Sequence, residues 1–181
     1  MRIISGKYRG KKLLSPQSEG VRPTSDRARE SVFNILNNRL ESSWENYALL
    51  DVFCGTGAFA LEAVSRGAKK VCLVDKNIKN AELNVKLFPS EKDKIILIKA
   101  NAESLPQTTQ KYNLLFMDAP YNQGLSTPAL ESLHKNKWLE EGCLCIVEVE
   151  KNESIKIPPA FEVQEERIYG LAKFIFLAYH P

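Results

Sequence analysis

The sequence has few metal-binding residues and no long apolar run. Its 181 residues include two histidines and four cysteines, and no two cysteines form a CxxC pair. Zinc sites are usually built from closely spaced cysteines and histidines, so we expect no metal and predict buried free thiols. No apolar run approaches the roughly 20 residues that cross a bilayer, and the first ten residues lack an apolar stretch of signal-peptide length. We therefore expect a cytoplasmic protein without membrane attachment.

Acidic residues are missing from the first twelve positions, although the whole chain has a net charge of only +3. The cations there are Arg2, Lys7, Arg9, Lys11 and Lys12, and they are followed by Arg22, Arg27 and Arg29. Clustered cations bind nucleic acid by releasing its counterions, whereas a solvated basic terminus would give the same pattern. Taken alone, the cluster only leans toward a nucleic-acid-contacting hairpin or arm over residues 1–20, ahead of the core of a single domain over residues 21–181.

Strand-like and helix-like segments alternate along most of the chain. The expected strands are residues 48–53, 70–75, 94–99, 112–118 and 143–150, after an N-terminal hairpin and before a closing antiparallel pair at 161–170 and 172–180. The expected helices are residues 26–40, 57–67, 78–88 and 127–139. This alternation predicts βαβ units and a mostly parallel sheet. Because ligands of such sheets bind at the carboxyl ends of the strands, the residues that follow each strand are the candidate site.

The first expected strand runs into a glycine loop, DVFCGTGAFALE. Gly55 and Gly57 allow a ligand to approach the backbone closely, and the following helix start favours polar ligand groups. Two features disfavour a dinucleotide: Ala60 stands where a third glycine is usual, and Asp51 would repel a pyrophosphate. The loop therefore suits a ligand with a cation or hydroxyl groups.

Two further strand ends carry polar residues. Asp75 ends the second strand, where a carboxylate can accept both ribose hydroxyls of a nucleoside; capping of the next helix is the competing interpretation. Asn101 ends the third strand and could contact adenine, although a turn-forming asparagine is the commoner use. With Asp51, these positions describe a nucleoside without a pyrophosphate, which fits S-adenosylmethionine.

The fourth strand ends in the stretch FMDAPY. The exocyclic amino group of a base is a poor nucleophile because its lone pair is delocalised into the ring. Asp118 and the Ala119 carbonyl could accept its two hydrogens, with Pro120 holding Ala119 extended and Tyr121 stacking on the base. An ordinary turn would also use these residues. The alignment of four strand ends favours methyl transfer that depends on positioning and electrostatics.

The chain resembles the bacterial 16S rRNA guanine-N2 methyltransferase family, whose members modify guanine 966 of the small-subunit RNA. The matching stretches are RIISGKYRGKKL, VRPTSDRARESVFNIL, LLDVFCGTGAFALEAVSRGAKKVCLVDKN and FMDAPY, in the same order and spacing across nearly the whole chain. The resemblance implies a class I S-adenosylmethionine-dependent methyltransferase, Rossmann-like, with a seven-stranded mostly parallel sheet and an N-terminal β-hairpin extension. The resemblance also implies that the substrate is 16S rRNA within the 30S subunit or a late assembly intermediate. We expect the protein to be a monomer.

On this basis the site residues fall into three groups. The catalytic residues are Asp118, Ala119, Pro120 and Tyr121. The cofactor-binding residues are Asp51, Phe53, Gly55, Thr56, Gly57, Asp75, Lys76, Asn101, Ala102 and Asp118. The RNA-contacting residues are Arg2, Lys7, Arg9, Lys11, Lys12, Arg22, Thr24 and Arg27.

Two departures from the family pattern fall inside this site. Ala119 replaces the first of two prolines, which predicts a less rigid loop, and Asn101 replaces an aspartate, which keeps an acceptor and gives up the charge. Three alternatives remain at this point: an adenine-N6 methyltransferase of RNA or DNA, an NAD-dependent dehydrogenase, and a non-catalytic RNA-binding protein. The RPTSDRARE segment disfavours the first alternative, and the absent third glycine disfavours the second.

Overall fold

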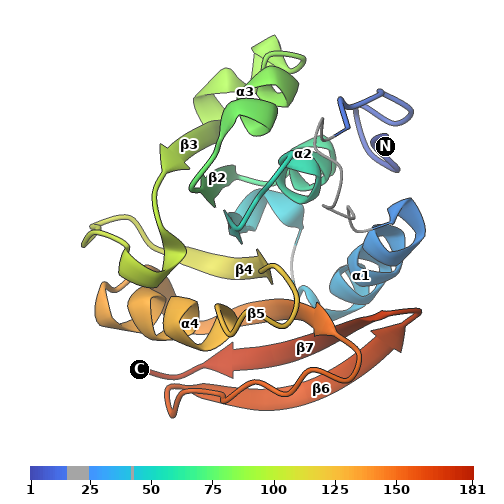
Figure 1. Ribbon diagram of the computed structural model, residues 1–181. Helices are drawn as coiled ribbons and strands as arrows, with labels where there is room; N and C mark the ends of the chain where they lie inside the picture. Colours follow the sequence, from blue (N-terminus) through green and yellow to red (C-terminus); the bar gives the residue numbers. More distant parts are fainter. Residues whose placement is uncertain (16–24, 42) are drawn as a thin grey trace.

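A seven-stranded sheet forms the centre of the described chain (Figure 1). The structure is a computed structural model that describes residues 1–15, 25–41 and 43–181. The strands are β1 (Ala48–Val52), β2 (Lys70–Asp75), β3 (Ile95–Lys99), β4 (Tyr112–Asp118), β5 (Leu139–Glu150), β6 (Phe161–Tyr169) and β7 (Ala172–Tyr179). Their order is β3-β2-β1-β4-β5-β7-β6, with β1 to β5 parallel and β7 antiparallel to both neighbours. The expected α/β fold with a mostly parallel sheet is confirmed.

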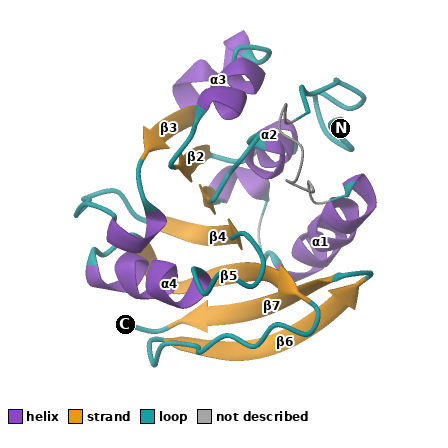
Figure 2. Cartoon of the chain, viewed as in Figure 1, coloured by secondary structure: helices purple, strands orange, loops and turns teal. Residues whose placement is uncertain are grey.

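Four α-helices of the described chain cover the two faces of the sheet (Figure 2). They are α1 (Asp26–Arg39), α2 (Ala58–Ser65), α3 (Lys79–Val85) and α4 (Ser126–Lys135), and the 3-10 helices are η1 (Trp44–Asn46), η2 (Pro89–Lys94) and η3 (Ala102–Ser104). Apolar side chains of α1, α2 and α3 form one core with the sheet, and those of α4 form a second core on the opposite face. Every residue of β1 is buried, because both faces of a parallel sheet are covered.

Two helices end earlier than their sequence patterns predict. The helix expected at 78–88 stops at Val85, since i→i+3 bonds from the N–H groups of Leu87 and Phe88 tighten the chain before Pro89. The helix expected at 127–139 stops at Lys135, because Lys137 has a φ of 60° and Leu139 already pairs with Tyr112 in the sheet.

The amino-terminal hairpin is minimal and docks on α2, as Figure 1 shows. It consists of one antiparallel bridge, Arg2 to Lys12. The fully buried Glu62 of α2 accepts hydrogen bonds from the N–H groups of Ile4 and Ser5, at 2.7 and 2.9 Å. Gly6 has a φ of 84°, and a Cβ at that position would lie 2.0 Å from a backbone oxygen of α2. The hairpin is therefore fitted closely to the helix that follows the glycine loop.

The prediction of buried free thiols can be compared with the four cysteines of the structure. All four are free and buried, as predicted. Within the described residues, no helix is long and apolar enough to span a membrane. The same residues bring together no group of three or more histidine, cysteine, aspartate or glutamate side chains that could hold a metal ion.

Candidate active site

The candidate site lies at the carboxyl edge of the sheet, where the strand order reverses beside β1. Val52 pairs with Val74 of β2 and with Met117 of β4, so the three strands end at the same level. The next residues along them are Phe53, Asp75 and Asp118. The sheet thus brings the ends of β1, β2 and β4 together at its topological switch point, the usual ligand site of this architecture.

The loop after β1 is held in an unusual backbone conformation. Phe53 has a φ of 60°, a conformation that side chains rarely adopt and that often marks a functional site. Gly57 begins α2 with a φ of 76°, and a Cβ there would lie 2.6 Å from the Leu73 side chain. Gly55 has a φ of 53° and open space where a Cβ would point. The loop therefore packs tightly on β2 at Gly57 and leaves room for a ligand at Gly55.

Asp75 is bound to the glycine loop and does not cap the next helix. Its Oδ2 accepts a hydrogen bond from the Gly55 N–H at 2.9 Å, and its Oδ1 accepts one from the Asn77 N–H at 3.0 Å. The N-terminal cap of α3 is Ile78, without a side-chain hydrogen bond. The helix-cap interpretation is wrong, and the carboxylate instead fixes the relative position of two loops at the candidate site.

Asp51 is buried within β1 below the glycine loop. Its Oδ2 accepts a 3.2 Å hydrogen bond from the N–H of Ala60 in the first turn of α2. Burial raises its pKa from 3.8 to about 8, against the opposing effect of the Ala60 hydrogen bond. A cationic or hydroxyl-bearing ligand would be needed to favour the ionised carboxylate. Because the buried carboxyl keeps its proton up to about pH 8, charge repulsion of a pyrophosphate by Asp51 stays a prediction.

Asn101 forms a turn, which was the commoner of the two uses considered for it. Its Oδ1 accepts a hydrogen bond from the Glu103 N–H at 3.2 Å and caps η3. Ala102 is buried at the start of this turn, and Lys76 reaches across to Glu103 at 3.4 Å. The loops after β2 and β3 are thereby joined, and a contact of Asn101 with adenine stays a prediction.

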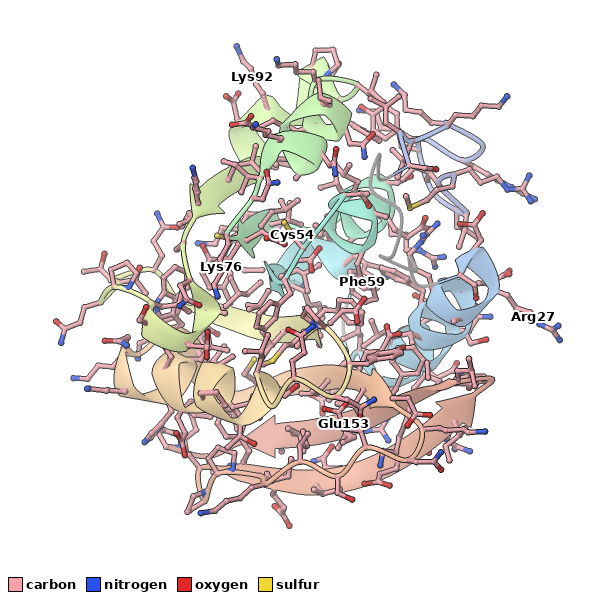
Figure 3. All side chains as sticks on the ribbon, in the orientation of Figure 1. Arg27, Cys54, Phe59, Lys76, Lys92 and Glu153 are labelled. Carbon is pink, nitrogen blue, oxygen red and sulfur yellow. The ribbon has the colours of Figure 1, made fainter. Side chains whose placement is uncertain are left out.

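The loop after β4 is hydrogen-bonded to the end of β5 and to the loop that follows β5. The Tyr121 hydroxyl donates a 2.6 Å hydrogen bond to Oε1 of Glu148, which is buried. Oε2 of Glu153, a residue labelled in Figure 3, accepts 3.0 and 3.3 Å bonds from the N–H groups of Asn122 and Glu150. Asn122 itself has a φ of 57°. These contacts fix the tyrosine ring although Ala119 replaces the stiffer proline.

A cavity of about 620 Å³ opens beside Tyr121. Its walls come from the start of α1, the acidic end of β5 and the β6–β7 turn, and include Arg27, Glu148 and Glu150. The sequence interpretation missed both glutamates. The pattern that identified Asp51, Asp75 and Asp118, a polar residue at the end of a buried strand, also occurs at the end of CLCIVEVE and would have found them.

The predicted RNA-contacting cations differ in their surroundings. Arg2, Arg9 and Lys12 are exposed. Lys7 is exposed too, but its Nζ lies 2.7 Å from Oε1 of Glu91, a bond that raises the pKa of Lys7 and lowers that of Glu91. Lys11 is half-buried. It donates to the Leu87 carbonyl and lies 4.9 Å above the Phe88 ring. Lys7 and Lys11 therefore help attach the hairpin, which their sequence positions did not reveal.

The arginines after the hairpin also divide into two kinds. Arg27 projects outward from α1 (Figure 3) and lines the cavity beside Tyr121. Arg29 is buried, and it donates to the Arg2 carbonyl at 2.6 Å and to Asp26 at 3.0 Å. Its place in the basic cluster is therefore explained by the fold and not by RNA. Arg22 and Thr24, and the boundary expected at residue 20, lie outside the described residues.

The chain is similar in sequence to known proteins along nearly its whole length. The family model of conserved hypothetical protein 95 matches residues 1–178. Ribosomal RNA small subunit methyltransferase D of Haemophilus influenzae is 34% identical over 184 residues, covering 96% of this chain and 91% of the relative. The protein of the same name from Escherichia coli K12 is 34% identical, covering 94% of this chain and 85% of the relative.

Solved structures extend the comparison to three dimensions. A putative methyltransferase yhhF from Escherichia coli superposes with a TM-score of 0.84 at 32% identity, covering 99% of this chain and 98% of the other. A SAM-dependent methyltransferase from Aquifex aeolicus, with a TM-score of 0.62 at 17% identity over 87% of this chain and 93% of the other, shows the fold alone. The fold is that of the class I methyltransferases, and the chain belongs to the ribosomal RNA small subunit methyltransferase D family, the family of conserved hypothetical protein 95.

Proposed function

We propose that this enzyme transfers a methyl group from S-adenosylmethionine to the exocyclic N2 of guanine 966 in 16S rRNA. The observation that carries the proposal is the position of the Asp118–Tyr121 loop. It lies at the switch point of a methyltransferase fold, next to the loops of Gly55 and Asp75 and beside a cavity that opens at Tyr121. Cofactor, acceptor group and base would meet at this place.

The residues present fit S-adenosylmethionine. Open space at Gly55 leaves room for an approaching ligand, and Asp75 places a carboxylate at the end of β2, where ribose hydroxyls are bound in related folds. Asp51 offers a buried carboxylate to a cationic amino group, with Phe53, Thr56 and Gly57 on the same loop. Lys76, Asn101 and Ala102 would border the adenine. When bound, the cofactor supplies an activated methyl group on a sulfonium.

The protein's own part in the chemistry is to make N2 nucleophilic and to align it. The Asp118 carboxylate and the Ala119 carbonyl would accept the two N2–H hydrogens and localise the nitrogen lone pair, while Tyr121 stacks on the base. When the lone pair of N2 attacks the methyl group that the bound cofactor would supply, Asp118 would take one N2 proton, and the electrons of that N–H bond would remain on the nitrogen. Placing these acceptors in advance is the main source of rate acceleration in such sites.

Recognition of the RNA would fall to the exposed basic residues. Arg2, Arg9 and Lys12 on the hairpin are solvent-facing cations, and Arg27 stands at the cavity itself. Lys7 would add to this surface, whereas Lys11 would act chiefly by holding the hairpin in place. Contacts of Arg22 and Thr24 with RNA stay part of the proposal. We propose that a monomer acts in the cytoplasm on 16S rRNA already assembled into the 30S subunit or a late intermediate.

The test is mass spectrometry of 16S rRNA from cells with and without the gene. Loss of one N2-methylguanosine at position 966, restored by the wild-type gene and not by an Asp118→Ala variant, is the expected result. Unchanged guanine methylation together with the loss of an N6-methyladenosine would overturn the proposal in favour of the adenine-N6 alternative. Purified protein with labelled S-adenosylmethionine and undermethylated 30S particles gives the matching measurement in vitro.

A further inference from the structure

Two carboxylates stand side by side at the candidate site. Asp118 at the end of β4 pairs in parallel register with Glu148 of β5, and neighbouring strands lie about 4.8 Å apart. Leu114 and Phe116 of β4 and Ile146 of β5 pack in the core on the α1 and α2 face. Because side chains alternate along a strand, Asp118 and Glu148 share that same face.

Glu148 combines burial with access to the cavity. The residue is only 2% exposed, yet it lines the cavity beside Tyr121. A buried carboxylate is costly unless hydrogen-bond donors surround it, and its two oxygens can accept about four hydrogen bonds. The Tyr121 hydroxyl supplies one of these at Oε1. Because each carboxylate oxygen can accept more than one hydrogen bond, a carboxylate oriented in this way can also accept one from a substrate.

The neighbouring acid of the cavity is arranged differently. Glu150 accepts hydrogen bonds from the Asn152 N–H at 2.8 Å and from the Asn152 side chain at 3.5 Å. Its carboxylate is engaged in the turn that follows β5, and its register partner is Ala172 of β7 rather than a residue of β4. Glu150 is thus a matched acid at the same cavity that lacks the pairing with Asp118.

We propose that Glu148 is the residue that selects guanine, by accepting a hydrogen bond from the base N1–H while Asp118 accepts one from N2–H. This inference rests on the proposed function and deepens it. Guanine presents N1–H and the N2 amino group as adjacent donors, which match two adjacent carboxylates. Adenine has an acceptor at N1, which a carboxylate would repel. Binding sites built around a substrate hydrogen bond reject analogues that lack it, because their own polar group is then left unpaired.

The probe is 2-aminopurine, which keeps the N2 amino group, has an acceptor nitrogen in place of the N1–H of guanine and also lacks O6, so the change of preference in Glu148→Gln is the decisive readout. Small subunits are reconstituted with either base at the target position, and kcat/KM for methylation is measured with the wild-type protein, Glu148→Gln, Glu150→Gln and Tyr121→Phe. The wild type should prefer guanine by at least about 100-fold. Glu148→Gln should reduce this preference by about 10- to 100-fold, because the glutamine amide can donate to the acceptor nitrogen of 2-aminopurine.

The two control variants separate base selection from support of the loop. Tyr121→Phe breaks the bond to Glu148 and should slow both substrates while keeping the preference for guanine. Glu150→Gln should keep the preference as well. If Glu148 only holds Tyr121, Glu148→Gln will slow both substrates equally, and that result overturns the inference. Equal methylation of the two bases by the wild type overturns it without any variant. If the wild type does not methylate subunits that carry guanine at the target position, the proposed function itself is contradicted.

Discussion

The main-chain N–H of Gly55 donates a 2.9 Å hydrogen bond to the carboxylate of Asp75, joining the loops after β1 and β2. The other carboxylate oxygen accepts from the Asn77 N–H. One side chain thus sets the shape of both loops, in addition to any contact with a ribose. A substitution of Asp75 consequently changes the loop as well as the ligand contact, and the two effects have to be separated.

A pair of variants separates them at Asp75. Asp75→Ala removes both acceptors and should weaken S-adenosylmethionine binding by about 1.5–3 kcal/mol, the scale of a hydrogen bond to a charged group. Asp75→Asn keeps one acceptor for the loop and loses the charge. Its affinity for S-adenosylmethionine should therefore lie between those of the wild type and Asp75→Ala. Isothermal calorimetry checks both. An Asp75→Ala affinity equal to that of the wild type would restrict this residue to loop structure.

Asp51 should make stability and cofactor binding depend on pH. Its pKa of about 8 in the folded protein lies above the ordinary 3.8, so the folded state retains a proton that the unfolded chain releases. The stability contribution is full below pH 3.8 and is lost as the pH rises through about 8, with a slope of up to about 1.4 kcal/mol per pH unit. Asp51→Asn should remove this decline. The free energy of unfolding of both proteins can be measured in urea at pH 5, 6, 7 and 8. If the wild type and Asp51→Asn show the same dependence on pH, the raised pKa of Asp51 is contradicted.

Cofactor binding offers an independent measurement of the same group. A cationic amino group beside Asp51 favours the ionised carboxylate, so binding near pH 7 should release a proton from the wild type. Calorimetry in buffers of different ionisation enthalpy counts that proton. Asp51→Asn should release fewer protons and bind more weakly. Equal proton release by both proteins would place the amino group elsewhere.

Asp118 should affect methyl transfer far more than cofactor binding. Its proposed partner is the N2 amino group, so Asp118→Ala should lower the methylation rate by roughly 10²–10³ and weaken S-adenosylmethionine binding only modestly. Asp118→Asn is the matched control, since it keeps one acceptor of nearly the same size and should retain more activity. The measurement is single-turnover methylation of 30S particles with calorimetry in parallel. Near-normal turnover by Asp118→Ala would contradict the mechanism.

Much of the site could be predicted because it depends on local features. Asp75 and Asp118 follow buried apolar runs, and parallel strands carry such residues to a common edge of the sheet whatever the details of packing. Gly55 and Gly57 indicated a tight loop between a strand and a helix. The strands and their alternation with helices were likewise visible in the sequence, apart from helix ends where Pro89 and Lys137 alter the backbone.

The features that escaped prediction depend on contacts between distant segments. Glu62 is an ordinary helix residue by sequence, and only docking of the hairpin shows that it accepts two backbone hydrogen bonds from Ile4 and Ser5. Lys11 is one cation among several until its contact with the Leu87 carbonyl is seen. Glu148 could have been selected by the strand-end rule, but its pairing with Asp118 requires the strand order.

Glu62 yields a prediction about stability. The carboxylate is fully buried and also lies 2.9 Å from Nε of Arg66. Glu62→Ala removes the acceptor of the Ile4 and Ser5 N–H groups and of the Arg66 side chain, which is 8% exposed. Removal of one member of a buried pair typically costs about 3–5 kcal/mol. Chemical unfolding should show a loss of that size. Glu82→Ala, in α3, is a control for removal of an exposed helical glutamate and should change stability much less.

The last prediction separates RNA binding from attachment of the hairpin. Arg2, Arg9 and Lys12 are exposed, so replacing the three by alanine should leave the free energy of unfolding and cofactor affinity close to wild type. The affinity for 30S particles should fall. Its dependence on salt should flatten, with the log–log slope decreasing by roughly 0.7–0.9 for each phosphate group that the variant no longer neutralises.

Lys11→Ala is the contrasting variant, because its bond to the Leu87 carbonyl and its position over the Phe88 ring tie the hairpin to the segment after α3. It should lower stability, whereas the triple variant should not. Binding measured at several salt concentrations for all three proteins completes the comparison. Parallel salt slopes for the wild type and the triple variant would mean that these three cations touch no phosphate, and the basic surface would then have to be sought around Arg27 at the mouth of the cavity.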